Sequence, residues 1–136
     1  MPLMSEGINF WPADFPSELA EAAFWSNEPA WEPHLAALVV EWLGLHQYAV
    51  LGTELWVIRD GLINTLPIGQ TGMPEVHGNT VNRRANEPWA AFVSRAASET
   101  VVYLRSFQSR EIVAPGKVHL NVTWVSEVEF EKLVSL

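Results

Sequence analysis

The spacing of hydrophobic positions changes along the chain, and these changes mark the expected helices and strands. Apolar residues recur three and four positions apart between residues 34 and 43, which predicts a helix that is buried on most sides. Pro33 suits the first turn of this helix, and Gly44 suits its C-terminal cap. A shorter helix is expected before it, from a cap at Asp14 to about Ser26.

The longest helical pattern lies in the second half of the chain. Mostly apolar positions trace one face over five turns: Trp89, Phe92, Val93, Ala96, Thr100, Tyr103, Leu104 and Phe107. Asn86 is the expected cap of this helix, with Pro88 in its first turn. Near the end of the chain, Ser126 and Glu129 form a capping-box pattern, which predicts a short C-terminal helix.

Between these helices the hydrophobic period falls to two, which is the spacing of strands. Residues 48–66 are expected to form a meander of three short strands, with Asp60–Gly61 in a type I′ turn. Residues 111–114 and 117–125 are expected to form a second hairpin. The segment 67–86 is rich in glycine and proline and is expected to be a long loop, a feature that is often functional in a compact domain.

The resulting order, α-α-β-β-β-α-β-β-α, predicts an α+β fold with a mostly antiparallel sheet of about five strands and with helices packed on one face. The alternation of apolar and polar residues at 117–124 is the main reason, because a strand covered on both faces would not place its polar residues on one side. The chain of 136 residues is expected to form a single domain, in which residues 1–16 are an irregular N-terminal arm packed on the body.

Charge is distributed unevenly, and this asymmetry carries the first functional hypothesis. Residues 1–58 hold eight acidic side chains and neither Lys nor Arg, whereas residues 59–136 balance, so the net charge of −8 lies entirely in the first half. Tryptophans are interleaved with these acids. We expect a surface for a basic protein partner, formed by Trp11, Glu18, Glu21, Trp25, Glu28, Trp31 and Glu32. The same charge argues against binding to nucleic acid or to a membrane surface.

This hypothesis describes a small binding protein of the kind represented by inhibitors, immunity proteins and secretion chaperones, a comparison that rests on functional analogy. A homodimer is a further expectation, because Trp56 lies between Leu55 and Val57 and the strand therefore has two apolar faces to cover. A cytoplasmic location, in a protein of bacterial style, is expected from the lack of cysteine, of a basic signal region and of an apolar run that spans a bilayer.

The second hypothesis concerns the polar segment from His77 to Trp89. Arg83 and Arg84 precede a helix N-terminus, whose free amides and dipole attract anions, and a histidine can exchange protons near neutral pH. A small-molecule or anion site, or an enzyme cleft, is then expected between the polar sheet face and the 67–86 loop, with His77, Arg83, Arg84, His119 and Asn121 as its residues. The plainer alternative is a polar connection that leads into the helix.

Several classes of chemistry find no support in the pattern of residues. The sequence has no cysteine and no nucleophile motif, and its histidines match no metal-ligand spacing. We therefore predict no catalytic residue, no metal and no cofactor, and we favour binding over catalysis.

Overall fold

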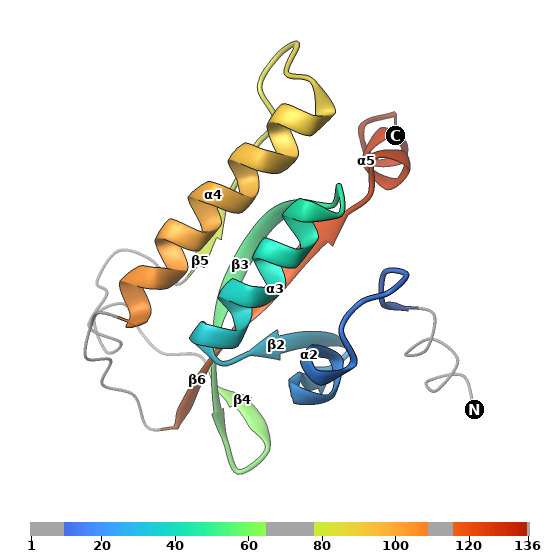
Figure 1. Ribbon diagram of the computed structural model, residues 1–136. Coiled ribbons are helices and arrows are strands. Elements are labelled where there is room, and N and C mark those ends of the chain that lie inside the picture. Colours follow the sequence, from blue (N-terminus) through green and yellow to red (C-terminus); the bar gives the residue numbers. More distant parts are fainter. Residues whose placement is uncertain (1–9, 65–77, 109–115, 136) are drawn as a thin grey trace.

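The computed structural model describes residues 10–64, 78–108 and 116–135 (Figure 1). The helices in these ranges are α2 (Ser17–Ala22), α3 (Pro33–Leu45), α4 (Trp89–Gln108) and α5 (Glu127–Val134). The strands are β1 (Phe24–Ser26), β2 (Glu28–Trp31), β3 (Ala49–Arg59), β4 (Leu62–Asn64), β5 (Gly78–Thr80) and β6 (Lys117–Val125). They form one antiparallel sheet in the order β1-β2-β6-β3-β4, and β5 also pairs with β3.

The helices α3 and α4 lie side by side across one face of the curled sheet (Figure 1). This arrangement confirms the predicted fold class, an α+β fold with helices packed against an antiparallel sheet. The predicted cap at Gly44 is wrong, because α3 continues through this residue to Leu45. A Cβ atom at Gly44 would lie 2.7 Å from the Cβ of Ala97, so glycine is needed for the close approach of α3 to α4.

The core lies between the helical layer and the sheet. The register of β3 against β6 pairs Leu55 with Leu120, and both side chains face the helices. The larger core cluster includes Trp31, Val39, Val40, Leu43, Val50, Leu104 and Leu120. A second cluster joins α4 to α5, where Trp89 and Phe92 contact Phe130. The predicted inner face of α4 is thus confirmed for Trp89, Phe92, Val93, Ala96, Thr100 and Leu104, which are all buried.

One strand replaces two of the three that were expected within residues 48–66. The strand β3 is continuous, with a shift of register between Val50 and Gly52. The glycine does not break the strand, because it lies at this irregularity, where its Cα packs against the backbone of Asn79 in β5. The Asp60–Gly61 turn is confirmed, since φ is 55° and 74° at these residues, as a type I′ turn requires.

The first predicted helix is too long. The helix α2 ends at Ala22, and a hairpin of β1 and β2 follows it, turning at Asn27 with φ of 65°. Asp14 does not cap α2, because it has φ of 64° and Pro16 occupies the cap position without a side-chain hydrogen bond. Local helical spacing gives way here to the pairing of aromatic strand residues with the sheet.

Besides Asp14, capping residues were expected at the starts of two further helices, and one of these caps is confirmed. At α5, the Ser126 hydroxyl accepts the amide of Glu129, and the Glu129 carboxylate accepts the amide of Ser126. At α4, the Pro88 carbonyl accepts the amide of Phe92, and Asn86 lies in the preceding turn with φ of 61°. The expected strand 111–114 and residues 67–77 of the expected loop lie outside the described residues, and residues 78–80 of that loop form β5.

Candidate functional site

The described part of the N-terminal arm, residues 10–16, packs on the body through its aromatic rings. Trp11 stacks on Trp124 of β6 at 6.2 Å between ring centroids, and Phe10 contacts the same indole edge-on at 5.2 Å. Phe15 stacks on Trp11 at 4.9 Å and meets Trp42 of α3 edge-on at 5.1 Å. These ring contacts hold the described part of the arm against the body, and the aromatic cluster extends the core to the surface.

The three tryptophans that were expected on a partner surface have different environments. The expectation that Trp31 lies on this surface is wrong. Its side chain is 0% exposed, and its indole Nε1 donates to the Leu19 carbonyl at 2.7 Å. Trp25 is 41% exposed at the outer edge of the sheet, and Trp11 is half-buried beside it, with 5.8 Å between the ring centroids. Only the latter two indoles are accessible to a partner.

Three of the four glutamates expected on this surface, Glu18, Glu21 and Glu28, are exposed. The fourth, Glu32, is half-buried at the N-terminal end of α3. Within the described ranges the ion pairs are Arg95–Glu87, Arg95–Glu99 and Arg105–Glu41, so none of these four carboxylates forms an ion pair there. We call the group Trp11, Glu18, Glu21, Trp25 and Glu28 the acidic aromatic surface.

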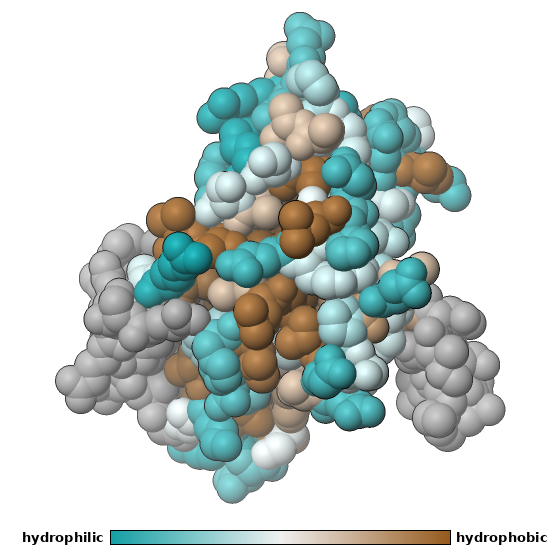
Figure 2. Space-filling model, viewed as in Figure 1, coloured by the Kyte–Doolittle hydropathy of each residue, from teal (hydrophilic) through white to brown (hydrophobic). Residues whose placement is uncertain are grey.

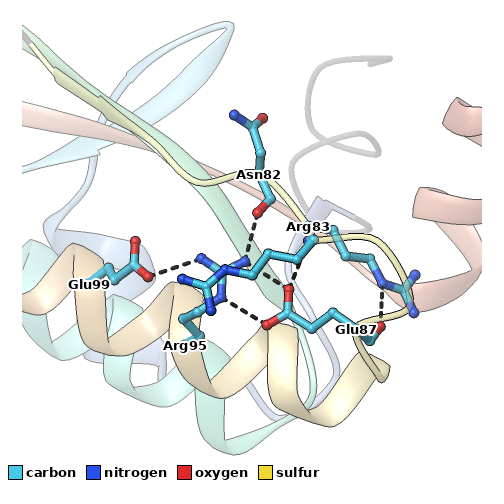
Figure 3. A network of polar contacts seen from close by, with 6 residues as sticks. Asn82, Arg83, Glu87, Arg95 and Glu99 are labelled. Carbon is cyan, nitrogen blue, oxygen red and sulfur yellow. Dashed lines mark hydrogen bonds and ion pairs between the residues drawn. The ribbon is translucent and has the colours of Figure 1, made fainter.

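The polar segment before α4 forms a different kind of structure, shown in Figure 3. The Arg95 guanidinium donates to both carboxylate oxygens of Glu87 at 2.8 Å, to Glu99 at 3.0 Å and to the Asn82 carbonyl at 2.7 Å. The hydrogen bond from Arg95, helped by one from the Arg84 amide, lowers the pKa of Glu87 to about 2. The same contacts raise the pKa of Arg95. This network joins residues 82–87, the segment that precedes α4, to the first turns of that helix.

The two adjacent arginines have separate structural roles in this segment. The Nε of Arg83 donates to the Glu87 carbonyl at 2.9 Å, and its guanidinium lies 5.5 Å from the Trp89 ring and 5.3 Å from the Phe130 ring. The Arg84 side chain is exposed, while its backbone amide donates to Glu87. The Glu87 carboxylate therefore occupies part of the position in which an external anion was expected. His77, which was expected at the same site, lies outside the described residues.

The other two residues of the expected cleft lie on the sheet face that is turned away from α3 and α4. Asn121 is only 6% exposed, and its side chain donates to the Pro29 carbonyl at 2.9 Å. His119 pairs with Trp56 in the register and lies 6.0 Å from the Phe24 ring. Burial lowers the pKa of His119, and the charge of Glu32 opposes that effect. Arg83 packs instead against Trp89 of α4 and Phe130 of α5, and the Arg84 side chain is exposed.

A small hollow lies between this sheet face and β5. Its volume is about 250 Å³, and its described lining includes Glu54, Asn79, Thr80 and Asn121. Neither arginine lines it, and this volume is below the roughly 300–1,000 Å³ that is usual for small-molecule sites. The structure thus brings Asn121 to a hollow near the expected place, without the charged residues that were expected to join it.

The environment of Trp56 removes one reason to expect a homodimer. Trp56 is 6% exposed in a single chain, and its indole donates to a Glu54 carboxylate oxygen at 2.9 Å. The side chain is therefore covered without a second copy, although the sequence pattern indicated that the strand has two apolar faces.

Sequence reasoning missed an apolar groove between α3 and α4, where hydrophobic atoms gather in Figure 2. Leu45, Val101 and Val102 line it, and Leu38 of α3 is exposed nearby. The helix was expected to be buried on most sides, but Leu38 is on its outer side, because the buried residues are Ala36, Ala37, Val39, Val40 and Leu43. Runs of apolar residues on both sides of a helix hide which face is inside.

Comparisons with known proteins add no assignment. No protein-family model, curated protein or solved structure matches the chain. The described residues contain no cluster of His, Cys, Asp or Glu that could hold a metal ion. Among the same residues, no helix has both the length and the apolar content needed to cross a membrane.

Proposed function

We propose that the protein binds a basic protein partner through the acidic aromatic surface and does not catalyse a reaction. The observation that carries this proposal is the combination of exposed carboxylates at Glu18, Glu21 and Glu28, which form no ion pair within the described residues, with accessible indole rings beside them. Arg83 and Arg95 are engaged elsewhere, on α4 and α5.

The two kinds of side chain support different parts of binding. Unpaired carboxylates attract a cationic partner over a distance of about a Debye length, which raises the association rate and makes it sensitive to salt. Exposed tryptophan supplies the large apolar contact that dominates many interfaces, and its ring face also attracts lysine and arginine. Trp25 is the expected anchor, because it is the most exposed of the described tryptophans.

The class of function that fits this chemistry is neutralisation or escort of a basic protein, as inhibitors, immunity proteins and secretion chaperones perform. The proposal includes a cytoplasmic location in a bacterial cell, with which the absence of cysteine agrees. It excludes nucleic acid as the partner, because a net charge of −8 repels phosphates.

The test is capture from a lysate of the native host, followed by measurement with the purified captured protein. The Glu21→Lys/Glu28→Lys variant is compared with Glu127→Lys/Glu131→Lys, a control on α5 that also changes the net charge from −8 to −4. We expect a basic partner whose affinity falls at least about tenfold in the first variant and changes little in the control.

Two results would count against this function. The first is equal loss of affinity in both variants, which would indicate a response to net charge and not to a surface. The second is a purified partner that is neutral or acidic and binds independently of salt. Thermal unfolding of each variant checks that its fold is retained.

A second candidate function is binding of a small polar ligand in the hollow beside Asn121, since that hollow lies where the polar sheet face meets β5. A thermal-shift screen with phosphate, nucleotides and organic acids tests it. A ligand that raises the melting temperature of the protein, and loses that effect in Thr80→Val, would support this function. A flat screen would oppose it.

A further inference from the structure

The outer edge of β6 is paired with β2 along only part of its length. On that side β2 pairs with β6 only through Trp31–Leu120 and Ala30–Asn121. The next residue of β2 is Pro29, which has no amide hydrogen to continue the ladder, and its carbonyl accepts the side-chain amide of Asn121 instead. The proline therefore ends the ladder, and within the described ranges no strand pairs with the outer side of residues 122–124.

A groove of about 470 Å³ runs beside this unpaired edge. The arm forms one wall, and the ends of β2 and β6 form the other. The lining residues are Phe10, Trp11, Pro12, Ala13, Glu28, Pro29, Tyr48, Val122, Thr123, Trp124, Ser126 and Glu129. If the ladder continued in register, Glu28 would lie opposite Thr123, so the groove occupies the place where β2 turns away from β6.

The charge of this lining has a single sign. Its charged residues are Glu28 and Glu129, and neither takes part in the ion pairs of the described residues. One carboxylate oxygen of Glu129 accepts the Ser126 amide in the capping box, which leaves the carboxylate charge in place. The stacked indoles of Trp11 and Trp124 line the same groove, 6.2 Å apart.

We propose that this groove binds an extended, lysine- or arginine-bearing segment of the partner, which adds as a strand to the outer edge of residues 122–124. The inference rests on the proposed function and identifies the part of the surface that recognises the partner. Backbone pairing with an exposed sheet edge supplies affinity without sequence specificity. The two carboxylates and the indole faces select a cationic side chain.

The test uses a synthetic peptide of alternating residues, acetyl-Lys-Val-Lys-Val-Lys-amide, and two isomers of equal charge. One isomer is N-methylated on both valines, and the other is N-methylated on the last two lysines. Only alternate amides of an added strand face the sheet edge, so strand addition makes the two isomers unequal. We expect one isomer to bind about tenfold more weakly than the parent peptide, because its missing amides are those that face β6.

Matched protein variants locate the binding within the surface. Glu28→Gln/Glu129→Gln is expected to weaken binding of the parent peptide by about tenfold. Glutamine can still accept the Ser126 amide, so the capping box of α5 is kept. Glu127→Gln/Glu131→Gln on α5 changes the net charge equally, outside the groove lining, and is expected to change the affinity by less than about twofold.

Hydrogen exchange of the outward-facing amides within residues 122–124 provides a second readout, since an added strand slows exchange at this edge. Three results would overturn the groove proposal. They are equal binding of both methylated isomers, an effect of the Glu127/Glu131 variant as large as that of the Glu28/Glu129 variant, and concentration-dependent protection of these amides without peptide, which would assign the edge to a second copy. Equal binding of both isomers would leave the proposed function intact, whereas loss of the salt-dependent partner described above would remove that function as well.

Discussion

The acidic aromatic surface and the arginine network before α4 both combine charged residues with aromatic rings, but they use their charges differently. Around α4, Arg95 pairs with Glu87 and Glu99, and Arg83 lies over Trp89 and Phe130. On the acidic aromatic surface, the exposed glutamates have no ion pair within the described residues.

This difference shows why a concentration of charge in a sequence does not by itself indicate a site. The arginine-rich segment resembles an anion site in the sequence, but its contacts fasten a loop to a helix. The acidic segment carries charges of one sign, which add nothing to the stability of the fold by pairing. Unpaired charge of one sign is therefore the better indicator of a partner surface in this protein.

The largest expected effect separates the buried indole from the exposed one. Trp31→Ala removes a fully buried side chain and its hydrogen bond to Leu19, so we expect it to lower the free energy of unfolding by about 3–5 kcal/mol. Trp25→Ala, at a residue that is 41% exposed, should lower it by less than about 1.5 kcal/mol and weaken partner binding instead. Urea unfolding of both variants provides the measurement. Equal losses of stability would erase the distinction between core and surface.

The next effect concerns acid stability and the arginine network. The pKa of Glu87 is lowered from 4.5 to about 2 in the folded protein, so its ionised form stabilises the fold above pH 4.5 and this contribution is lost as the pH falls toward 2. Glu87→Gln should be less stable than the wild type at pH 7 and should lose less stability between pH 5 and pH 2. Urea unfolding at a series of pH values measures how the free energy of unfolding of each protein changes with pH. An equal change in both proteins would mean that the pKa of Glu87 is not lowered.

A smaller effect is expected at His119, which lies outside both regions. Burial lowers its pKa below the usual 6.5, so the unfolded chain takes up protons more readily and the fold loses stability as the pH falls below about 6.5. NMR titration of the imidazole signals measures the pKa directly. A value at or above 6.5 would show that the ring is solvated or that the charge of Glu32 outweighs burial.

The predictions that succeeded rest on local chemistry. The Asp60–Gly61 turn, the capping box at Ser126 and Glu129, and the inner face of α4 each follow from a few neighbouring residues. The α+β class follows from the order of these elements. Failures occurred where tertiary contacts decide the outcome, as in the β1–β2 hairpin around Asn27, where strand pairing with β6 replaces a helical pattern.

The candidate site was only partly accessible from sequence. The exposure of Glu18, Glu21 and Glu28 is expected from the charge of these side chains. The burial of Trp31 depends instead on packing against the arm and α2. The sequence did not reveal the unpaired edge of β6 either. Pro29 is a partial indication, because a proline ends the hydrogen-bonded ladder of the strand that contains it. That indication becomes informative only once the register of β2 against β6 is known.

The central claim, that a basic partner contacts the acidic aromatic surface, is tested most directly by NMR of the tryptophan indole N–H signals. The labelled protein is titrated with the lysine–valine peptide at low salt and again at about 0.5 M salt, where screening is strong. We expect saturable shifts of the Trp11, Trp25 and Trp124 signals that vanish at high salt, with the Trp89 signal unchanged. Shifts confined to Trp89, beside the arginine network, or no shift at any indole, would contradict it.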